Sequence, residues 1–157
     1  MADIIVRTAL EQDEEQLYRC LLEHEDAGSF GAVQSENRIR EHIELATRGQ
    51  GGFHGVIDTP DPDDPIRIAG TIGIVFERYW WTENYHLQIL WLFVRQPYRT
   101  LRLDNALMEF AKAYRDELRK DQWIELVDSP FSETRLETKL ALWRRWGRQI
   151  GGIFIIK

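Results

Sequence analysis

The residues with the clearest chemical potential lie in the stretch QPYRTLRLDNALMEFAK, at positions 96–112, which follows the apolar run ILWLFV. A loop that leads from a strand into a helix presents free backbone amides, and these amides attract an anion such as phosphate. Arg99 and Arg102 add charged donors that fit phosphate oxygens in a bidentate fashion, and Thr100 adds a hydroxyl group. The stretch therefore predicts a phosphate-binding turn.

Two features of the same stretch oppose phosphate binding. Such turns usually carry glycines, which allow close backbone approach and a positive φ, whereas this turn carries none. Asp104 falls in the first helical turn, where it repels an anion by roughly 3 kcal/mol at ~5 Å and an effective dielectric of ~20. The alternative interpretation is a solvated loop in which Arg99, Arg102 and Asp104 form ion pairs and bind no ligand.

The elements around this turn follow from periodicity and from stop signals. Strands are predicted by alternating or apolar runs at 4–9, 52–58, 66–78, 84–95, 122–127 and 151–157. Helices are predicted by amphipathic spacing at 11–24, 35–49, 103–119 and 132–147. Ser35 can cap the second helix, and Gly49 can end it. Because a helical crossover follows the strand at 84–95, we expect an α/β protein of the α+β kind, a mixed sheet with helices on both faces.

Length and composition limit the class of protein. A chain of 157 residues, 43% hydrophobic and 29% charged, fits one domain that spans residues 1–157. The net charge of −6 argues against nonspecific nucleic-acid binding, and no apolar run reaches the ~18 residues of a membrane span. The N-terminus lacks the basic flank and apolar core of a signal peptide. We therefore expect a cytoplasmic protein in which Cys20, the single cysteine, is a buried inert thiol.

The order of elements and two motifs resemble the GNAT superfamily of acyl-CoA-dependent N-acyltransferases, over essentially the whole chain. In LFVRQPYRTLRLDNALMEFAK, the family's V-x-P-x-Y-R falls on Val94, Pro97, Tyr98 and Arg99. TKLALWRRWG resembles the family's helix R-A-I-x-L-Y-E-K-L-G. The pattern looks most like the divergent GNAT-type proteins encoded by bacteriophages. The resemblance implies a GNAT-like fold with a central mixed sheet of about six to seven strands.

The resemblance also implies an activity, in which acetyl-CoA is the co-substrate and an acyl group passes directly to an amine of a small molecule or a protein. A backbone amide between Leu92 and Val94 would polarise the thioester carbonyl. The cofactor-binding positions that follow from the match are Leu92, Phe93, Val94, Arg99, Thr100, Leu101, Arg102, Leu103 and Asp104. No metal is expected, because metal-ligand spacing is missing among His24, His42, His54 and His86. A homodimer is compatible with the sequence.

Several positions depart from the family pattern. The family's glycines fall on Thr100 and Arg102, and its Gly or Ala falls on Asp104. The Tyr that often protonates the leaving thiolate falls on Trp143, whose indole N–H does not release a proton at accessible pH. The Asn that often begins that helix falls on Leu136. The alternative from a different class is therefore a catalytically silent GNAT-fold binding or assembly module.

The strand at 84–95 offers one candidate general base. It carries His86 and Gln88, of which only His86 titrates near neutral pH. Regular alternation would place both side chains on one face of the strand with Leu90, Leu92 and Val94. The competing interpretation is a partly exposed His86 without a catalytic role. Protonation of the thiolate would fall to water, Tyr98 or Tyr114.

Two further stretches have an unusual composition. ERYWWTENY, at 77–85, crowds aromatic residues at a hairpin tip, and adjacent Trp80 and Trp81 should point to opposite faces of a strand. One of the two would enter the core, while the other would be partly buried or would line a ligand site or a protein interface. DTPDPDDP, at 58–65, predicts a solvated acidic turn, with attraction of a cationic substrate as the alternative.

Overall fold

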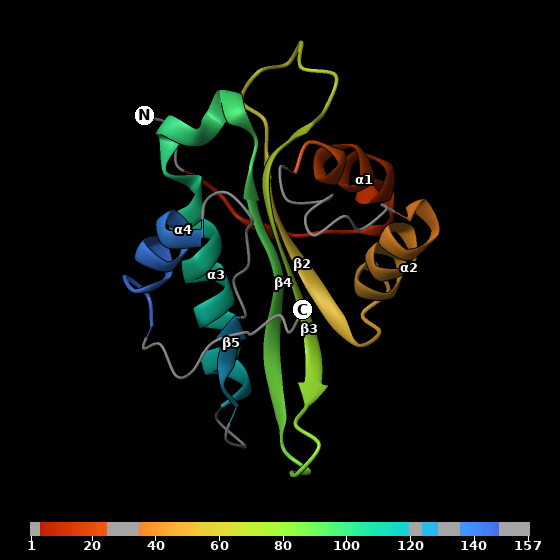
Figure 1. Ribbon diagram of the computed structural model, residues 1–157. Helices are drawn as coiled ribbons and strands as arrows, with labels where there is room; N and C mark the ends of the chain where they lie inside the picture. The colour runs from red at the N-terminus through yellow and green to blue at the C-terminus, as the bar shows by residue number, and fades with distance from the viewer. Residues whose placement is uncertain (1–3, 25–34, 120–123, 129–135, 148–157) are drawn as a thin grey trace, which may run out of the picture.

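The computed structural model describes residues 4–24, 35–119, 124–128 and 136–147, and it places a β-sheet between two layers of helices (Figure 1). The strands are β1 (Arg7–Thr8), β2 (Gly52–Asp58), β3 (Ile68–Arg78), β4 (Tyr85–Val94) and β5 (Leu126–Asp128). The α-helices are α1 (Glu14–Leu22), α2 (Glu36–Thr47), α3 (Leu103–Leu118) and α4 (Leu136–Trp143). Two 3-10 helices are η1 (Glu11–Asp13) and η3 (Gln96–Leu101). None of these helices is long and apolar enough to cross a membrane.

The sheet order is β1-β2-β3-β4-β5, and the one parallel pair of the described strands is β4 with β5. The helix α3 connects these two parallel strands, which confirms the predicted crossover and the mixed sheet with helices on both faces. Five strands are described, fewer than the six to seven expected. The expected strand at 151–157 lies outside the described residues.

The predicted signals for α2 are confirmed. The Ser35 hydroxyl accepts a hydrogen bond from the Arg38 backbone N–H at 3.4 Å, as an N-cap residue does. Gly49 follows the helix with φ of 67°, a left-handed conformation that glycine adopts without steric cost.

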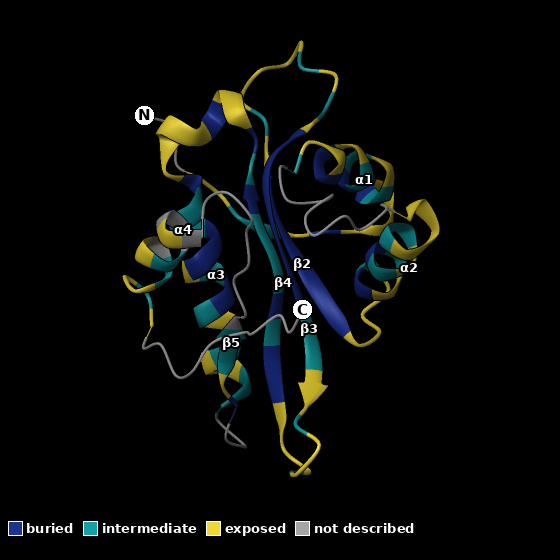
Figure 2. Ribbon diagram, viewed as in Figure 1, coloured by how far each residue is buried: buried dark blue, intermediate teal, exposed yellow. Residues whose placement is uncertain are grey.

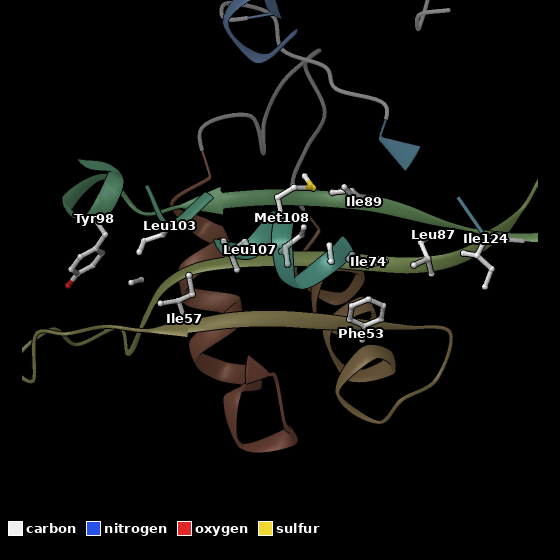
Figure 3. Packing of buried hydrophobic residues seen from close by; sticks show 13 residues of the cluster. Phe53, Ile57, Ile74, Leu87, Ile89, Tyr98, Leu103, Leu107, Met108 and Ile124 are labelled. Carbon is white, nitrogen blue, oxygen red and sulfur yellow. The ribbon is translucent and has the colours of Figure 1, made fainter. Parts of the chain in front are cut away.

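Each face of the sheet has its own hydrophobic core (Figure 2). On one face α3 buries Leu107, Met108 and Ala111 against the strands (Figure 3). On the other face, α1 and α2 bury a second set of hydrophobic side chains against Val56 and Phe93 of the sheet. These side chains include Leu17, Cys20, Leu21 and Ile43. Burial raises the pKa of the Cys20 thiol to about 12, which confirms the prediction of a buried, unreactive cysteine.

An irregularity in β4 changes which residues share a face. Gly73 pairs with Trp91 but Ile74 pairs with Ile89, so Leu90 is an extra residue in the strand. Leu92 packs on the α3 face together with Ile89. The prediction that His86 shares a face with Leu92 is therefore wrong, because a one-residue insertion reverses the alternation.

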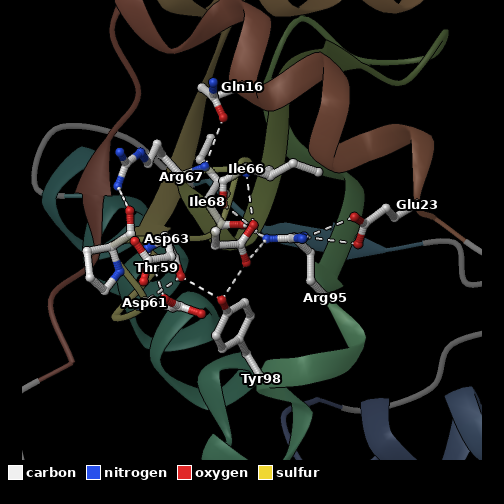
Figure 4. Close-up of polar contacts among 12 residues, drawn as sticks. Gln16, Glu23, Thr59, Asp61, Asp63, Ile66, Arg67, Ile68, Arg95 and Tyr98 are labelled. Carbon is white, nitrogen blue, oxygen red and sulfur yellow. Dashed lines mark hydrogen bonds and ion pairs between the residues drawn. The ribbon is translucent and has the colours of Figure 1, made fainter.

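A buried ion network fixes the end of β4 (Figure 4). The side chain of Arg95, only 7% exposed, pairs with the Glu23 carboxylate at 3.0 Å and with the Asp64 carboxylate at 2.8 Å. Its guanidinium also donates to the backbone carbonyl of Ile66 at 3.1 Å. The Tyr98 hydroxyl donates to Asp64 at 2.5 Å. The network therefore joins α1, the loop between β2 and β3, and the residues that follow β4.

The acidic turn at 58–65 is thus only partly solvated. Asp61 and Asp63 are exposed, as expected, whereas the Asp64 side chain is buried against Arg95. Hydrogen bonds from Arg95 and then from Tyr98 hold the pKa of Asp64 at about 2, below its usual value. Because Asp64 is committed to this network, the turn is a structural anchor at that residue.

We predict that Asp64→Asn lowers the free energy of unfolding by about 2 to 4 kcal/mol at pH 7, because it removes one partner of a buried ion pair. The folded-state pKa of Asp64 lies below the unfolded one, so this stabilisation is complete above about pH 4 and is lost as the pH falls toward 2. Urea unfolding of both proteins between pH 7 and pH 2 measures the difference. Asp63→Asn, at the exposed neighbour, is the control and should change stability by less than about 0.5 kcal/mol. Equal costs for the two variants, or a difference that does not vary with pH, would contradict the assignment.

Candidate functional site

The candidate site is the turn between β4 and α3. Pro97 occupies the start of η3, where its missing N–H and its fixed φ are tolerated. The Tyr98 backbone N–H donates to the Arg95 carbonyl at 3.0 Å, and the buried Tyr98 ring packs in the core under α3. The turn is therefore attached at its base to both the ion network and the hydrophobic core.

Arg102 is the residue that ends η3 and precedes α3. It has φ of 54° and ψ of 38°, and it is the one non-glycine residue with positive φ in the described part of the chain. A left-handed conformation costs roughly 1 to 2 kcal/mol for a residue with a Cβ, and such a cost is typically retained at functional positions. Arg102 thus has the backbone geometry of the glycine that phosphate-binding turns carry, although its side chain is different.

The conformation of Arg102 leaves the first amides of α3 available. No side chain caps the N-terminus of α3, so the amide groups of the first helical turn, including those of Leu103 and Asp104, have no intrahelical acceptor. The Leu103 side chain is buried in the core, so its contribution to a ligand would come from the backbone. A helix of this length carries a partial positive charge at that end, which favours an anion.

The charged side chains surround this helix end. Arg99, Thr100 and Arg102 are exposed, and the Arg99 Nε donates to the Val94 carbonyl at 3.2 Å, which holds that guanidinium across the end of β4. Within the described residues, the side chains of Arg102 and Asp104 form no ion pair or hydrogen bond with each other or with a neighbour. The sequence allowed an alternative in which ion pairs hold this loop together. No such ion pair joins Arg102 to Asp104 in the structure.

The end of β4 presents backbone amides on its outer edge. The Arg95 N–H donates to the Ala69 carbonyl of β3 at 3.0 Å. Because amide direction alternates along a strand, the N–H groups of Leu92 and Val94 face away from β3, toward the side of β5. The described pairing with β5 stops at Ile89. Leu92 and Val94 lie beyond that point, where their amides can meet a ligand.

A cavity of about 410 Å³ adjoins the turn on the face of the sheet that α1 covers. Two of the predicted cofactor-binding residues, Phe93 and Arg99, line it, together with Glu23, Arg95, Gln96 and Pro97. The structure thus places Phe93 and Arg99 at this cavity, whereas the side chains of Leu92, Val94 and Leu103 pack in the core on the α3 face.

His86 is not part of this turn or its cavity. It lies near the start of β4, and its β3 partner Glu77 is five residues from Ile72, the partner of Leu92, which is about 17 Å at the rise of a strand. Its side chain is buried, stacks on the Tyr79 ring at 4.1 Å, and faces the opposite side of the sheet from Leu92. A general base must reach its proton directly or through one water molecule, and this separation exceeds that reach for chemistry at the Leu92 amide.

The other candidate proton donors are engaged elsewhere. The Tyr98 hydroxyl is held between Asp64 and Thr59, and burial and the Asp64 carboxylate raise its pKa. Tyr114 stacks on Phe53 at 3.8 Å, over β2. Trp143 is partly buried against the core under α3. Water remains the proton donor that this arrangement allows for a thiolate.

Sequence reasoning missed the residues that hold the turn. Glu23 and Asp64 lie 72 and 31 positions from Arg95 in the chain, so no local pattern pairs them. The one available signal was Arg95 itself, a charged residue directly after an apolar strand. Because a buried guanidinium requires partners, that signal could have prompted a search for carboxylates.

Comparisons with known proteins identify the fold. No family model and no curated protein sequence matches the chain. Among solved structures, a possible acetyltransferase from Clostridium difficile 630 is similar with a TM-score of 0.69 and 13% identity, over 98% of this chain and 97% of the other. An acetyltransferase of the GNAT family from Staphylococcus aureus MU50 has a TM-score of 0.68 and 18% identity, over 95% and 87%. AAC(6')-Iy, in complex with a bisubstrate analogue CoA-S-monomethyl-acetylneamine, has a TM-score of 0.66 and 11% identity, over 99% of both chains. The chain therefore has the GNAT-like fold that its motifs predicted.

We predict that Arg102→Gly raises the free energy of unfolding by about 0.5 to 1 kcal/mol. Glycine removes the strain of the left-handed conformation, but it also increases the conformational entropy of the unfolded chain, which offsets part of the gain. Thermal unfolding should show an increase of roughly 2 to 4 °C. Arg102→Ala keeps a Cβ and is the matched control, with no gain expected. An equal change in both variants would show that the backbone of Arg102 is not strained.

Proposed function

We propose that the protein is a divergent acyl-CoA-dependent N-acyltransferase that transfers an acetyl group from acetyl-CoA directly to an amine. The observation that carries the proposal is Arg102, which adopts a glycine-like backbone at an uncapped helix N-terminus and, with Arg99, adds an exposed cationic side chain there. A strained arginine at this position has no packing role, because its side chain is exposed. An anionic ligand would account for both its charge and its conformation.

In this proposal the amides at the start of α3 hold the pyrophosphate of coenzyme A, and Arg99 and Arg102 neutralise its charge. The chain of the cofactor then runs along the outer edge of β4, where the Leu92 and Val94 amides lie beyond the β5 pairing. One of these amides polarises the thioester carbonyl and stabilises the oxyanion that forms when the amine attacks. The similar solved structures are acetyltransferases, which supports this class of reaction at a general level.

Proton transfer in this proposal depends mainly on water. The attacking amine must lose a proton, and the thiolate must gain one as it leaves. His86 stays our candidate for the base from the sequence, but it lies farther from Leu92 than one water molecule can bridge, so it could act only through a chain of several ordered water molecules. The phage-type affiliation, the amine acceptor and a cytoplasmic location stay predictions from the sequence.

The alternative, a GNAT-fold module without chemistry, keeps one favourable observation. Asp104 places a carboxylate in the first turn of α3, close to where the pyrophosphate would lie, and no described cation neutralises it. That carboxylate weakens anion binding relative to the glycine or alanine of the family pattern.

The test is thermal unfolding with and without acetyl-CoA. At 100 times its dissociation constant, a ligand stabilises the folded state by about 2.7 kcal/mol, which corresponds to a shift of roughly 5 to 10 °C for a chain of this size. Acetyl-CoA at millimolar concentration should produce this shift. The absence of a shift with acetyl-CoA and with other acyl-CoA thioesters would favour the module without chemistry.

Two variants make the same experiment specific for the turn. Arg102→Ala should weaken coenzyme A binding by about 1.5 to 3 kcal/mol, because it removes a charged hydrogen-bond donor to the pyrophosphate. Asp104→Ala should tighten binding, because it removes a negative charge close to the negatively charged pyrophosphate. A pantetheine thioester without pyrophosphate should respond to neither. Glu109→Gln, on an exposed position of α3 away from its N-terminus, is the control. Unchanged affinity in all three variants would mean that the turn does not contact the pyrophosphate.

We predict that His86→Phe, which preserves a ring beside Tyr79, lowers turnover by a factor of about 10² or more if His86 is the base. Binding of acetyl-CoA should not change, since the turn lies at the other end of β4. Steady-state kinetics together with a coenzyme A titration separate these two effects. A change in turnover of less than a few-fold would remove His86 from the proton path and leave bulk water as the acceptor.

A further inference from the structure

The hairpin between β3 and β4 lies at the end of the sheet opposite the turn (Figure 1). Its residues line a second cavity. Its volume is about 300 Å³, within the range of small-molecule sites. It is lined by Tyr79, Trp81, Thr82, Asn84, Tyr85, His86 and Glu125. These residues come from the hairpin, from the start of β4 and from the residue just before β5.

Aromatic rings form one side of this cavity. The Tyr79 ring is sandwiched between His86 at 4.1 Å and Trp81 at 4.8 Å, with interplanar angles of 16° and 10°. Trp80 meets Trp81 edge to face at 5.4 Å. Neither tryptophan enters the core, since Trp80 is 91% and Trp81 63% exposed. The expectation that one of them would be a core residue is wrong, because both lie in the turn rather than in a strand.

His86 lies at the inner side of the cavity and is 95% buried. Its Nδ1 has no hydrogen-bond partner among the described residues, but this atom is closed off from solvent and so does not face the cavity. His86 therefore contributes its ring, which stacks on Tyr79, and not a hydrogen bond to a ligand.

The charge around the cavity favours a cation. Glu125 is exposed at its rim and forms no ion pair with a described residue. The nearby cation, Arg78, is committed elsewhere, since its guanidinium lies 4.1 Å from the Tyr85 ring centroid, hydrogen-bonds the Tyr85 hydroxyl and pairs with Glu83. A positive ligand would meet the Glu125 carboxylate and the faces or edges of several rings at once.

We propose that this cavity binds an organic ammonium ion attached to an apolar or aromatic skeleton. The ammonium group pairs with Glu125 and lies close enough to the aromatic rings for a cation–π attraction. The skeleton packs on Trp81, which explains why a large apolar side chain is exposed there. Binding does not depend on acyl transfer, because the cavity lies at the opposite end of β4 from the turn.

The probe is 2-phenylethylamine, which is protonated at neutral pH, and its neutral counterpart is 2-phenylethanol. Ligand-detected NMR titrations of the full chain, without any coenzyme A, measure both affinities. The amine should bind saturably, and the alcohol should bind about tenfold more weakly because it lacks the charge. Since coenzyme A is absent, this result is independent of whether the turn binds a cofactor.

The variant Glu125→Gln assigns the binding to this cavity. It should weaken the amine about five- to tenfold, the usual effect of losing one hydrogen bond to a charged group. Glu11→Gln, at an exposed carboxylate on η1, should leave the affinity unchanged. Circular dichroism and thermal unfolding verify that each variant is folded, and Trp81→Leu, at an exposed residue, repeats the test without touching buried groups.

The proposal is overturned if 2-phenylethanol binds as tightly as the amine, or if the folded Glu125→Gln and Trp81→Leu variants bind the amine like the wild type. It is also overturned if the amine shows no saturable binding and the protein is instead a dimer. In that case the variants Trp80→Ser and Trp81→Ser should dissociate the dimer. That last result would assign the exposed tryptophans to a contact between two copies of the chain.

Discussion

The burial of one guanidinium constrains the rest of the architecture. A charged group as deeply buried as Arg95 is stable only when hydrogen bonds and opposite charges compensate for the loss of water. Glu23 directly after α1, Asp64 in the loop after β2, and the carbonyls of Ile66 and Ile68 provide that compensation. Segments that are distant in the chain therefore converge on the residue directly after β4. The turn into α3 begins from this fixed point, which allows Arg102 to be held in an unfavourable conformation.

The strand β4 connects two regions with different chemistry. At one end its outer amides and the start of α3 form a positive region suited to a phosphate-containing cofactor. At the other end the hairpin forms an aromatic cavity with a carboxylate that pairs with no described residue, and this cavity is suited to a cation. The extra residue Leu90 lies between them and reverses which side chains face each layer of helices. One strand thus presents regions suited to ligands of opposite charge at its two ends.

The sequence predicted most of the fold because local signals carried it. The apolar spacing of α3, the Ser35 cap and the Gly49 stop depend on neighbours within a few residues, and all were confirmed. The extra residue at Leu90 was missed because β4 is apolar on both faces, so its pattern does not show a change of register. The partners of Arg95 were missed because they are distant in the chain. Trp80 and Trp81 were correctly placed at a hairpin tip, but one of them was expected in the core because the alternation of a strand was extended into the turn.

The left-handed backbone at Arg102 could not be predicted from the residue type, because arginine rarely adopts it. The alignment with a family glycine was the single indication, and the structure gives that position the matching conformation. The function of the turn thus depends on whether backbone geometry alone, with arginine in place of glycine, can present amides to a pyrophosphate.

The most direct test is a titration of isotope-labelled protein with coenzyme A, followed by the amide resonances of Leu103 and Asp104 in two-dimensional NMR spectra. We predict that both resonances shift markedly and saturably with coenzyme A, and that they shift little with a pantetheine thioester that lacks the pyrophosphate. If neither amide moves at millimolar coenzyme A, or if the largest shifts fall outside the turn and the end of β4, the assignment of this helix N-terminus as a pyrophosphate site is wrong.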